Sequence, residues 1–194
     1  MNDEKKILAG SWIQAIGTVL SAISSTRFLV RGEEESDGLD IVGNVLQATG
    51  NALEADGQEG FSYGRIGNGI QAVGNITVIS GLVLPEEKII RGKLFITGNL
   101  FQALGAATAL GEEWEATDAD AMAIIGNILQ VIGNSLQAIG GAEEIRTGES
   151  ENTDAVITTG SWIQAIGAVI LALEITKEQT VDEKESKNKI PKEC

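Results

Sequence analysis

The sequence predicts an all-α protein, a six-helix tandem-repeat bundle with glycine heptads and close helix–helix packing. Three observations support this fold class: an eight-residue cassette recurs six times, glycines are spaced by seven residues, and charged, turn-rich segments separate the cassettes. A seven-residue spacing is typical of packed helices, whereas a strand would show a period of two.

The cassette reads Gly, then Asn or Ser, any residue, an apolar residue, Gln, a small residue, any residue and Gly. Its copies are GSWIQAIG (10–17), GNVLQATG (43–50), GNGIQAVG (67–74), GNLFQALG (98–105), GNILQVIG (126–133) and GSWIQAIG again (160–167). Successive copies begin 24 to 34 residues apart, which suits one helix and one loop per repeat. The residues expected at helix–helix contacts are Gly10, Gln14, Gly17, Gly43, Gln47, Gly50, Gly67, Gln71, Gly74, Gly98, Gln102, Gly105, Gly126, Gln130, Gly133, Gly160, Gln164 and Gly167.

The first three helices are expected at about 4–28, 37–56 and 62–83. The first contains an uncharged run that resembles a secretion signal, but the same cassette recurs at residue 160, so we interpret it as mature structure. The second and third continue the seven-residue glycine spacing. Asn68–Gly69 in the third is a strong turn signal. We keep it helical because the other five cassettes carry apolar residues at that place.

The last three helices are expected at about 86–111, 117–143 and 153–177. Pro85 followed by two glutamates is typical of a helix N-terminus, where acidic side chains favour the helix dipole. Residues 1–177 then form one repeat domain. The charged tail, 178–194, has few apolar residues and is expected to be disordered. The N-cap candidates are Thr117 or Asp118 for the fifth helix and Thr153 or Asp154 for the sixth.

A helical wheel of the cassette has a wide apolar face and an opposite face of Gly, Gln, Asn, Ser and Ala. This second face carries almost no charge, although glycine costs about 1 kcal/mol relative to alanine inside a helix. Small residues let helices approach closely, and amides can hydrogen-bond across the contact. We therefore expect the apolar face in a core and the Gly/Gln face in a second, tighter helix–helix contact.

The composition excludes several kinds of chemistry. A net charge of −14 argues against nucleic acid as a partner. The chain has no histidine, and its only cysteine is Cys194, so no intrachain disulfide forms. The acidic pairs occur in charged, turn-rich segments, and no metal-binding or nucleotide-binding motif is present. The sequence therefore predicts no enzyme, no catalytic or metal-ligating residue and no cofactor.

The sequence leaves two cellular locations of the protein open, the cytoplasm and a membrane. Five stretches without any charge, each about as long as a bilayer crossing, favour a membrane protein: 7–26, 66–84, 94–111, 121–142 and 155–173. Against this, every cassette carries a glutamine, whose amide is costly in hydrocarbon unless it is paired. Lys and Arg also show no clear bias toward one side. We expect a cytoplasmic bundle, with a membrane-spanning or pore-forming protein as the alternative.

The cassettes resemble a family of uncharacterised, glycine-rich repetitive proteins of bacilli. This resemblance implies no activity, only a bacterial, non-catalytic protein. The expected role is structural or interactive, with self-association through the Gly/Gln faces, and the partner is a second copy or another protein. The two terminal cassettes alone carry tryptophan, at Trp12 and Trp162. Terminal repeats lack one neighbour, so we expect these tryptophans to cap the array or to meet if it closes on itself.

Overall fold

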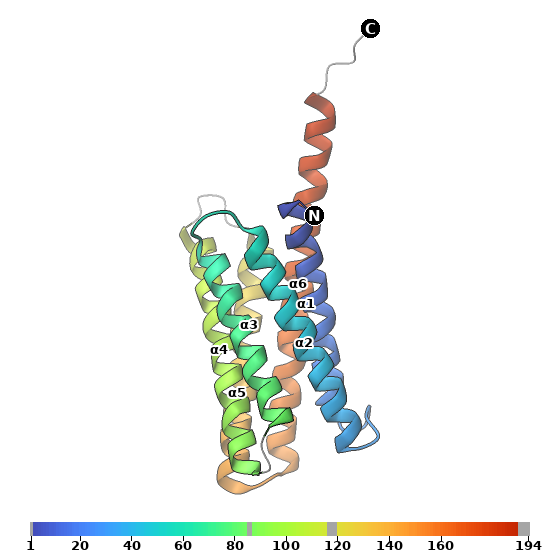
Figure 1. Ribbon diagram of the computed structural model, residues 1–194, viewed down its shortest axis with the longest axis vertical. Coiled ribbons are helices and arrows are strands. Elements are labelled where there is room, and N and C mark those ends of the chain that lie inside the picture. Colours follow the sequence, from blue (N-terminus) through green and yellow to red (C-terminus); the bar gives the residue numbers. More distant parts are fainter. Residues whose placement is uncertain (1, 85–86, 116–119, 190–194) are drawn as a thin grey trace.

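Six α-helices make up the computed structural model, which describes residues 2–84, 87–115 and 120–189. The helices are α1 (Asp3–Ser24), α2 (Glu33–Gly57), α3 (Tyr63–Val83), α4 (Lys88–Glu115), α5 (Ala121–Thr147) and α6 (Glu151–Lys189). No strand occurs in the described stretches, so the predicted all-α bundle is confirmed. Successive helices run in opposite directions, and α1 begins at the end of the bundle from which α6 leaves it (Figure 1).

The helices form a closed ring. Each helix packs against its neighbours in the chain, and α6 packs against α1. Among the described residues, helices that face each other across the ring make no backbone contact, so side chains alone occupy the central axis. The most extensive contacts lie within three hairpins, α1–α2, α3–α4 and α5–α6.

Cassette glycines allow the close packing inside each hairpin. A Cβ atom added at Gly17 would lie 2.5 Å from the carbonyl oxygen of Gly43 on the facing helix, a distance that real Cβ atoms do not adopt. Such an approach brings Cα–H groups against carbonyl oxygens, a contact that recurs between closely packed helices. The facing pairs are Gly10–Gly50, Gly17–Gly43, Gly67–Gly105, Gly74–Gly98, Gly126–Gly167 and Gly133–Gly160.

The helix starts follow local capping chemistry. Ser62 Oγ accepts a hydrogen bond from the Arg65 amide at 3.0 Å and begins α3, which is helical through Asn68–Gly69 as predicted. Asp120 caps α5 by accepting from the Met122 amide at 2.7 Å. The predicted starts at Pro85, Thr117 and Asp118 lie outside the described residues.

The sixth helix differs from its prediction at both ends. It begins at Glu151 because Ser150 and Thr153 exchange reciprocal hydrogen bonds, so Thr153 lies inside the first turn and the cap precedes it. It continues to Lys189, so residues 178–189 are helical where we expected disorder. Glu, Lys and Gln are good helix formers, and the Gln179 side chain donates to the carbonyl oxygen of Glu4 on α1. Residues 190–194 of the tail lie outside the described part of the chain.

The bundle is polar inside and apolar outside, which overturns the expected placement of the apolar faces. Among the described residues, the buried apolar side chains are nine alanines and Val78. The largest fully buried side chains are instead polar: Gln130, Asn51, Asn75, Asn134, Thr18 and Ser11. The Gly/Gln faces do form the tighter contact, but they form it within this one chain. They are therefore not available for the predicted self-association.

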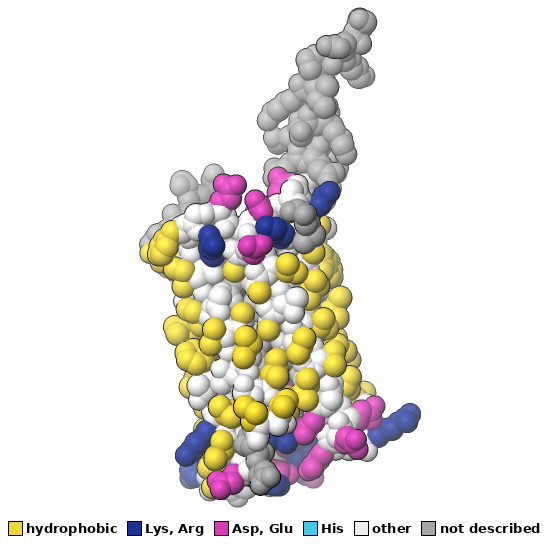
Figure 2. Space-filling view, viewed as in Figure 1, with side chains coloured by type: hydrophobic (Ala, Val, Ile, Leu, Met, Phe, Trp, Pro, Cys, Tyr) yellow, Lys and Arg dark blue, Asp and Glu magenta, His cyan; other side chains and the backbone are white. Residues whose placement is uncertain are grey.

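Large apolar side chains lie on the outer surface of every helix. On the face shown in Figure 2 they are spread over the middle of the bundle, and acidic and basic side chains gather at its two ends. Ile16 is 53% exposed, Ile76 56% and Ile166 52%. A helix that met water on its outer face would carry charged residues there. This distribution is the reverse of that in a water-soluble bundle.

Candidate functional site

The six cassette glutamines meet on the axis of the ring in two groups of three. Those of the odd-numbered helices form the first group: Gln14 Nε2 donates to the Oε1 atoms of Gln71 at 3.5 Å and Gln130 at 3.3 Å. Those of the even-numbered helices form the second group. Gln164 Nε2 donates to Oε1 of Gln47 at 3.0 Å and to Oε1 of Gln102 at 2.9 Å.

We call these groups the odd and even glutamine triads. Each of their six side chains is at most 4% exposed. The triads arise because odd and even helices run in opposite directions, while side chains of a helix lean toward its N-terminus. Together the triads close the axis with amides at its centre.

Two tryptophans hydrogen-bond across the contact between α1 and α6, where the ring closes. Trp12 Nε1 donates to Thr176 Oγ1 at 3.0 Å, and Trp162 Nε1 donates to Thr26 Oγ1 at 3.1 Å. Thr176 lies 14 residues beyond Trp162 on α6, or about 21 Å of helix, so the two indoles bond at opposite ends of the α1–α6 pair. The expected contact between Trp12 and Trp162 is not formed, although the two helices that carry them do meet.

Several buried amides on the axis have polar atoms without a hydrogen-bond partner. Both polar atoms of Asn51 and of Asn75 are unpaired, as are Asn134 Oδ1 and Gln130 Nε2. Each of these four side chains is at most 1% exposed. Buried polar groups of this kind bind water in proteins, because an unpaired amide costs about 1–3 kcal/mol. The axis is therefore built to hold water or another polar guest on both sides of the triads.

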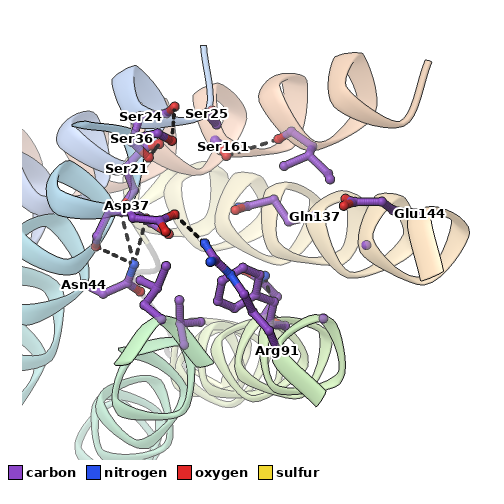
Figure 3. A pocket seen from close by; sticks show the side chains of 18 of the residues that line it. Ser21, Ser24, Ser25, Ser36, Asp37, Asn44, Arg91, Gln137, Glu144 and Ser161 are labelled. Atoms are coloured by element: carbon purple, nitrogen blue, oxygen red, sulfur yellow. Dashed lines mark hydrogen bonds and ion pairs between the residues drawn. The ribbon is translucent and has the colours of Figure 1, made fainter. Parts of the chain in front are cut away.

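A cavity of about 700 Å³ opens at the end of the bundle opposite the start of α1. We call it the vestibule (Figure 3). Hydroxyl, amide and charged side chains line it together with apolar ones such as Val78 and Phe95, and its floor includes Gln47, Gln102 and Gln164 of the even triad. Figure 3 shows Asn44 and Gln137 directed toward its interior from α2 and α5. Gln137 Nε2 donates to Gln164 Oε1 at 2.9 Å, which links the vestibule wall to the even triad.

The charges of the vestibule are unbalanced. Arg91 bonds to Asp37 and lies 5.3 Å from the centre of the Phe95 ring. Lys88 pairs with Glu149 at 3.4 Å. Within the part of the chain that the structure describes, these are the only two basic residues that line the vestibule, and both are therefore matched. Three further carboxylates remain in its lining: Glu33, Asp40 and Glu144.

A polar stripe runs along the inner face of α2 from the vestibule to the other end of the bundle. It consists of Asp40, Asn44, Gln47, Asn51 and Glu54, which are spaced by four, three, four and three residues. From Asn44 onward, each of its side chains is at least 93% buried. Asp40 lines the vestibule and accepts from Asn44 Nδ2 at 2.9 Å. A carboxylate therefore stands at each end of a row of amides.

Sequence reasoning found the cassette glutamines and missed the rest of the site. The α2 stripe has a heptad spacing that is visible in the sequence, but nothing in the sequence assigns Asp40 and Glu54 to the interior of the bundle. The vestibule combines residues from all six helices, and its lining follows from tertiary packing alone. Among the described residues there is no group of three or more His, Cys, Asp or Glu that could hold a metal ion.

The helices of this chain have the dimensions of membrane spans. Of the described residues, five segments are long and apolar enough to cross a bilayer: Asp3–Ser24, Tyr63–Val83, Lys88–Glu112, Ala121–Thr147 and Glu151–Val181. The second helix does not meet this criterion, because it carries the stripe and acidic residues at both ends.

Comparison with known proteins gives a family and no activity. No curated protein and no solved structure matches the chain. One family model does match, and it spans residues 5–172, which include all six cassettes. The chain therefore belongs to the family of unknown function DUF6944.

Proposed function

We propose that this protein is a non-catalytic integral membrane protein whose six helices surround a pathway for small polar solutes. The observation that carries the proposal is the reversed polarity of the bundle: amides fill its axis and large apolar side chains cover its outside. In hydrocarbon such an exterior is favourable, and polar groups are tolerated where they face one another inside the bundle.

The dimensions of the bundle fit a bilayer. A helix of 21 residues such as α3 is about 31 Å long, close to the thickness of the hydrocarbon core. Charged side chains gather at both ends of the bundle, where headgroups and water would lie (Figure 2). The second helix crosses with the others because the ring holds it between α1 and α3.

A water-soluble oligomer explains the exterior less well. Exposed apolar side chains occur on all six helices, around the whole circumference of the ring. A second copy docked on one side would leave the remaining faces in water, whereas a bilayer covers them all. Self-association of bundles within a membrane is compatible with the proposal but is not required by it.

Extraction and permeability together test the proposal. Membranes that contain the full chain are washed with alkaline carbonate, and we expect the protein to stay in the pellet. The purified protein is then reconstituted into liposomes, and glycerol entry is followed by stopped-flow light scattering. We expect faster entry than into empty liposomes.

A matched pair of variants controls the permeability assay. Asn134→Leu replaces a fully buried amide on the axis by an apolar side chain of similar size, and it should slow glycerol entry. Ile132→Leu changes a side chain that is 44% exposed on the outer surface, and it should have no effect. Complete release by carbonate would refute the membrane location. Retention with the permeability of empty liposomes would refute the solute pathway.

A further inference from the structure

We propose that the polar stripe of α2 conducts small monovalent cations, with Glu54 as the site that binds them at the end remote from the vestibule. This inference rests on the proposed membrane location and names the class of solute. The residues of the stripe, Asp40, Asn44, Gln47, Asn51 and Glu54, supply oxygen ligands along one line through the bundle.

Glu54 has the features of a ligand site within the interior of the bundle. It is 7% exposed, and its Oε1 atom has no hydrogen-bond partner. Its side chain crosses over Gly10 of α1, where an added Cβ would lie 2.8 Å from Glu54 Cγ. Asn68 of α3 lies near its carboxylate. A buried carboxylate with a free oxygen and amide neighbours is a favourable environment for a hard cation, which prefers oxygen ligands.

Asn51 continues the site toward the centre of the bundle. It lies one turn before Glu54 on α2, is 1% exposed, and has neither its oxygen nor its nitrogen paired. Gln47 of the even triad lies one further turn along. An amide oxygen can replace part of the hydration shell of a cation, as carbonyl oxygens do in selective channels.

The charge of the stripe selects cations over anions. Both of its ends carry carboxylates, and the two basic side chains in the vestibule lining already pair with Asp37 and Glu149. A mouth whose lining has an excess of one sign concentrates ions of the opposite sign. One carboxylate with neutral amides matches a single positive charge better than a divalent ion, for which sites typically use several carboxylates.

The glutamine triads act as the barrier of this pathway. In the structure their hydrogen bonds close the axis between the vestibule and Glu54. Passage therefore requires the amides to rotate away from one another and toward the ion, so conduction is slow compared with that of an open pore.

Cation flux into liposomes tests the inference. The full chain is reconstituted with a trapped dye for Na⁺, K⁺ or H⁺, and an inward gradient of that ion is imposed. We expect entry of at least one of these ions above the rate in empty liposomes and no entry of chloride. The separate dyes distinguish a path for protons from a path for metal cations.

Variants of the stripe provide the decisive comparison. Glu54→Gln keeps the shape but removes the charge, and it should lower cation flux at least tenfold. Glu54→Asp keeps the charge and should retain most of the flux. The matched control is Glu34→Gln in the exposed first turn of α2, which should leave the flux unchanged. If Glu54→Gln fails to fold, Asp40→Asn tests the opposite end of the stripe with the same expectation.

The outcomes separate this inference from the proposed function. Equal cation flux in the wild type and in a folded Glu54→Gln or Asp40→Asn variant would overturn the inference. Glycerol entry without any cation entry would also overturn it, and the membrane pathway for neutral solutes would stand. Release of the protein from carbonate-washed membranes would instead contradict the proposed function itself.

Discussion

Gly17 of α1 and Gly43 of α2 lie so close that a Cβ atom added to Gly17 would sit 2.5 Å from the carbonyl oxygen of Gly43. The obstacle is backbone, so it cannot rotate away as a side chain could. The equivalent glycines of the other two hairpins make the same contact. Glycine recurs every seven residues because a side chain at these positions would force the two backbones apart. These glycines therefore set how closely the two helices of each hairpin pack.

Replacement of Gly17 by alanine should separate α1 from α2. We expect Gly17→Ala to lower the free energy of unfolding by about 1–3 kcal/mol, the range typical of overpacked sites. Gly69 is the control, because nothing lies within 4 Å of a Cβ added there and the residue is also helical. Gly69→Ala should raise the free energy of unfolding by up to about 1 kcal/mol through helix propensity. Denaturant unfolding in detergent, followed by circular dichroism, measures both. Effects of the same sign would contradict the close-packing argument.

The two glutamine triads should differ in strength. Gln164 makes hydrogen bonds of 3.0 and 2.9 Å to its triad partners and accepts a third from Gln137. Gln14 makes longer bonds, of 3.5 and 3.3 Å. Removal of either amide leaves buried partners unpaired, at about 1–3 kcal/mol for each group that finds no water. We therefore expect Gln164→Leu to destabilise the bundle more than Gln14→Leu does.

Unfolding in the same detergent, with Ile166→Leu on the outer surface as a neutral control, provides the comparison. A double-mutant cycle with Gln47→Leu and Gln164→Leu should give a coupling energy well above zero, because these residues share a hydrogen bond. Additive effects of the two substitutions would show that the even triad does not act as a unit.

The number and type of helices were predictable from the sequence, but the direction of their faces was not. The cassette places Gln14 and Ile16 on different sides of α1, and a helical wheel recovers that separation. Which side points inward depends on whether the surroundings are water or lipid, and the wheel does not contain that information. The division of the glutamines into odd and even triads could not be predicted from the sequence either, because it depends on the closure of the ring.

The contact between α1 and α6 that closes the ring predicts that an engineered disulfide will form between them. Thr158 Oγ1 of α6 donates to the carbonyl oxygen of Ser25, just beyond the end of α1, at 2.6 Å. The bond joins a side chain to a backbone oxygen, so the two Cα atoms lie within about 7 Å, the upper end of the separations that a disulfide spans. With Cys194, the only cysteine, changed to serine, the pair Ser25→Cys and Thr158→Cys should oxidise to an intrachain disulfide in high yield. Each single variant should remain reduced and monomeric on non-reducing gels. A disulfide-linked dimer from the double variant would instead indicate an open array that pairs with a second chain.

Asp120 predicts an acid-sensitive contact at the end of the bundle where α1 begins. The Lys177 ammonium, 2.7 Å away, and the Met122 amide hold the pKa of this carboxyl below its ordinary value of 3.8. A carboxyl with a lowered pKa in the folded state stabilises it fully above the unfolded value and loses that contribution as the pH falls through the folded value. Asp120→Asn should therefore be less stable than the wild type at neutral pH, and the difference should shrink below pH 3.8 and vanish below the lowered pKa of the folded state. Thermal melting of both proteins across this range measures it, and a difference that persists in acid would contradict the ion pair.

Spin labels on the outer surface of the bundle should show that this surface contacts lipid. Single cysteines at Ile76 and Ile166, both more than half exposed, are introduced in a Cys194→Ser background and labelled with a nitroxide. In liposomes we expect oxygen, which is enriched in hydrocarbon, to change the spin relaxation of these labels strongly. A water-soluble nickel chelate should change it only weakly. A label at Glu34, exposed at the start of α2, should show the opposite preference. Because Ile76 follows directly after the buried Asn75, its label tests the polarity of the bundle one residue from the axis face. A nickel response at Ile76 equal to that at Glu34 would place the apolar outer surface in water.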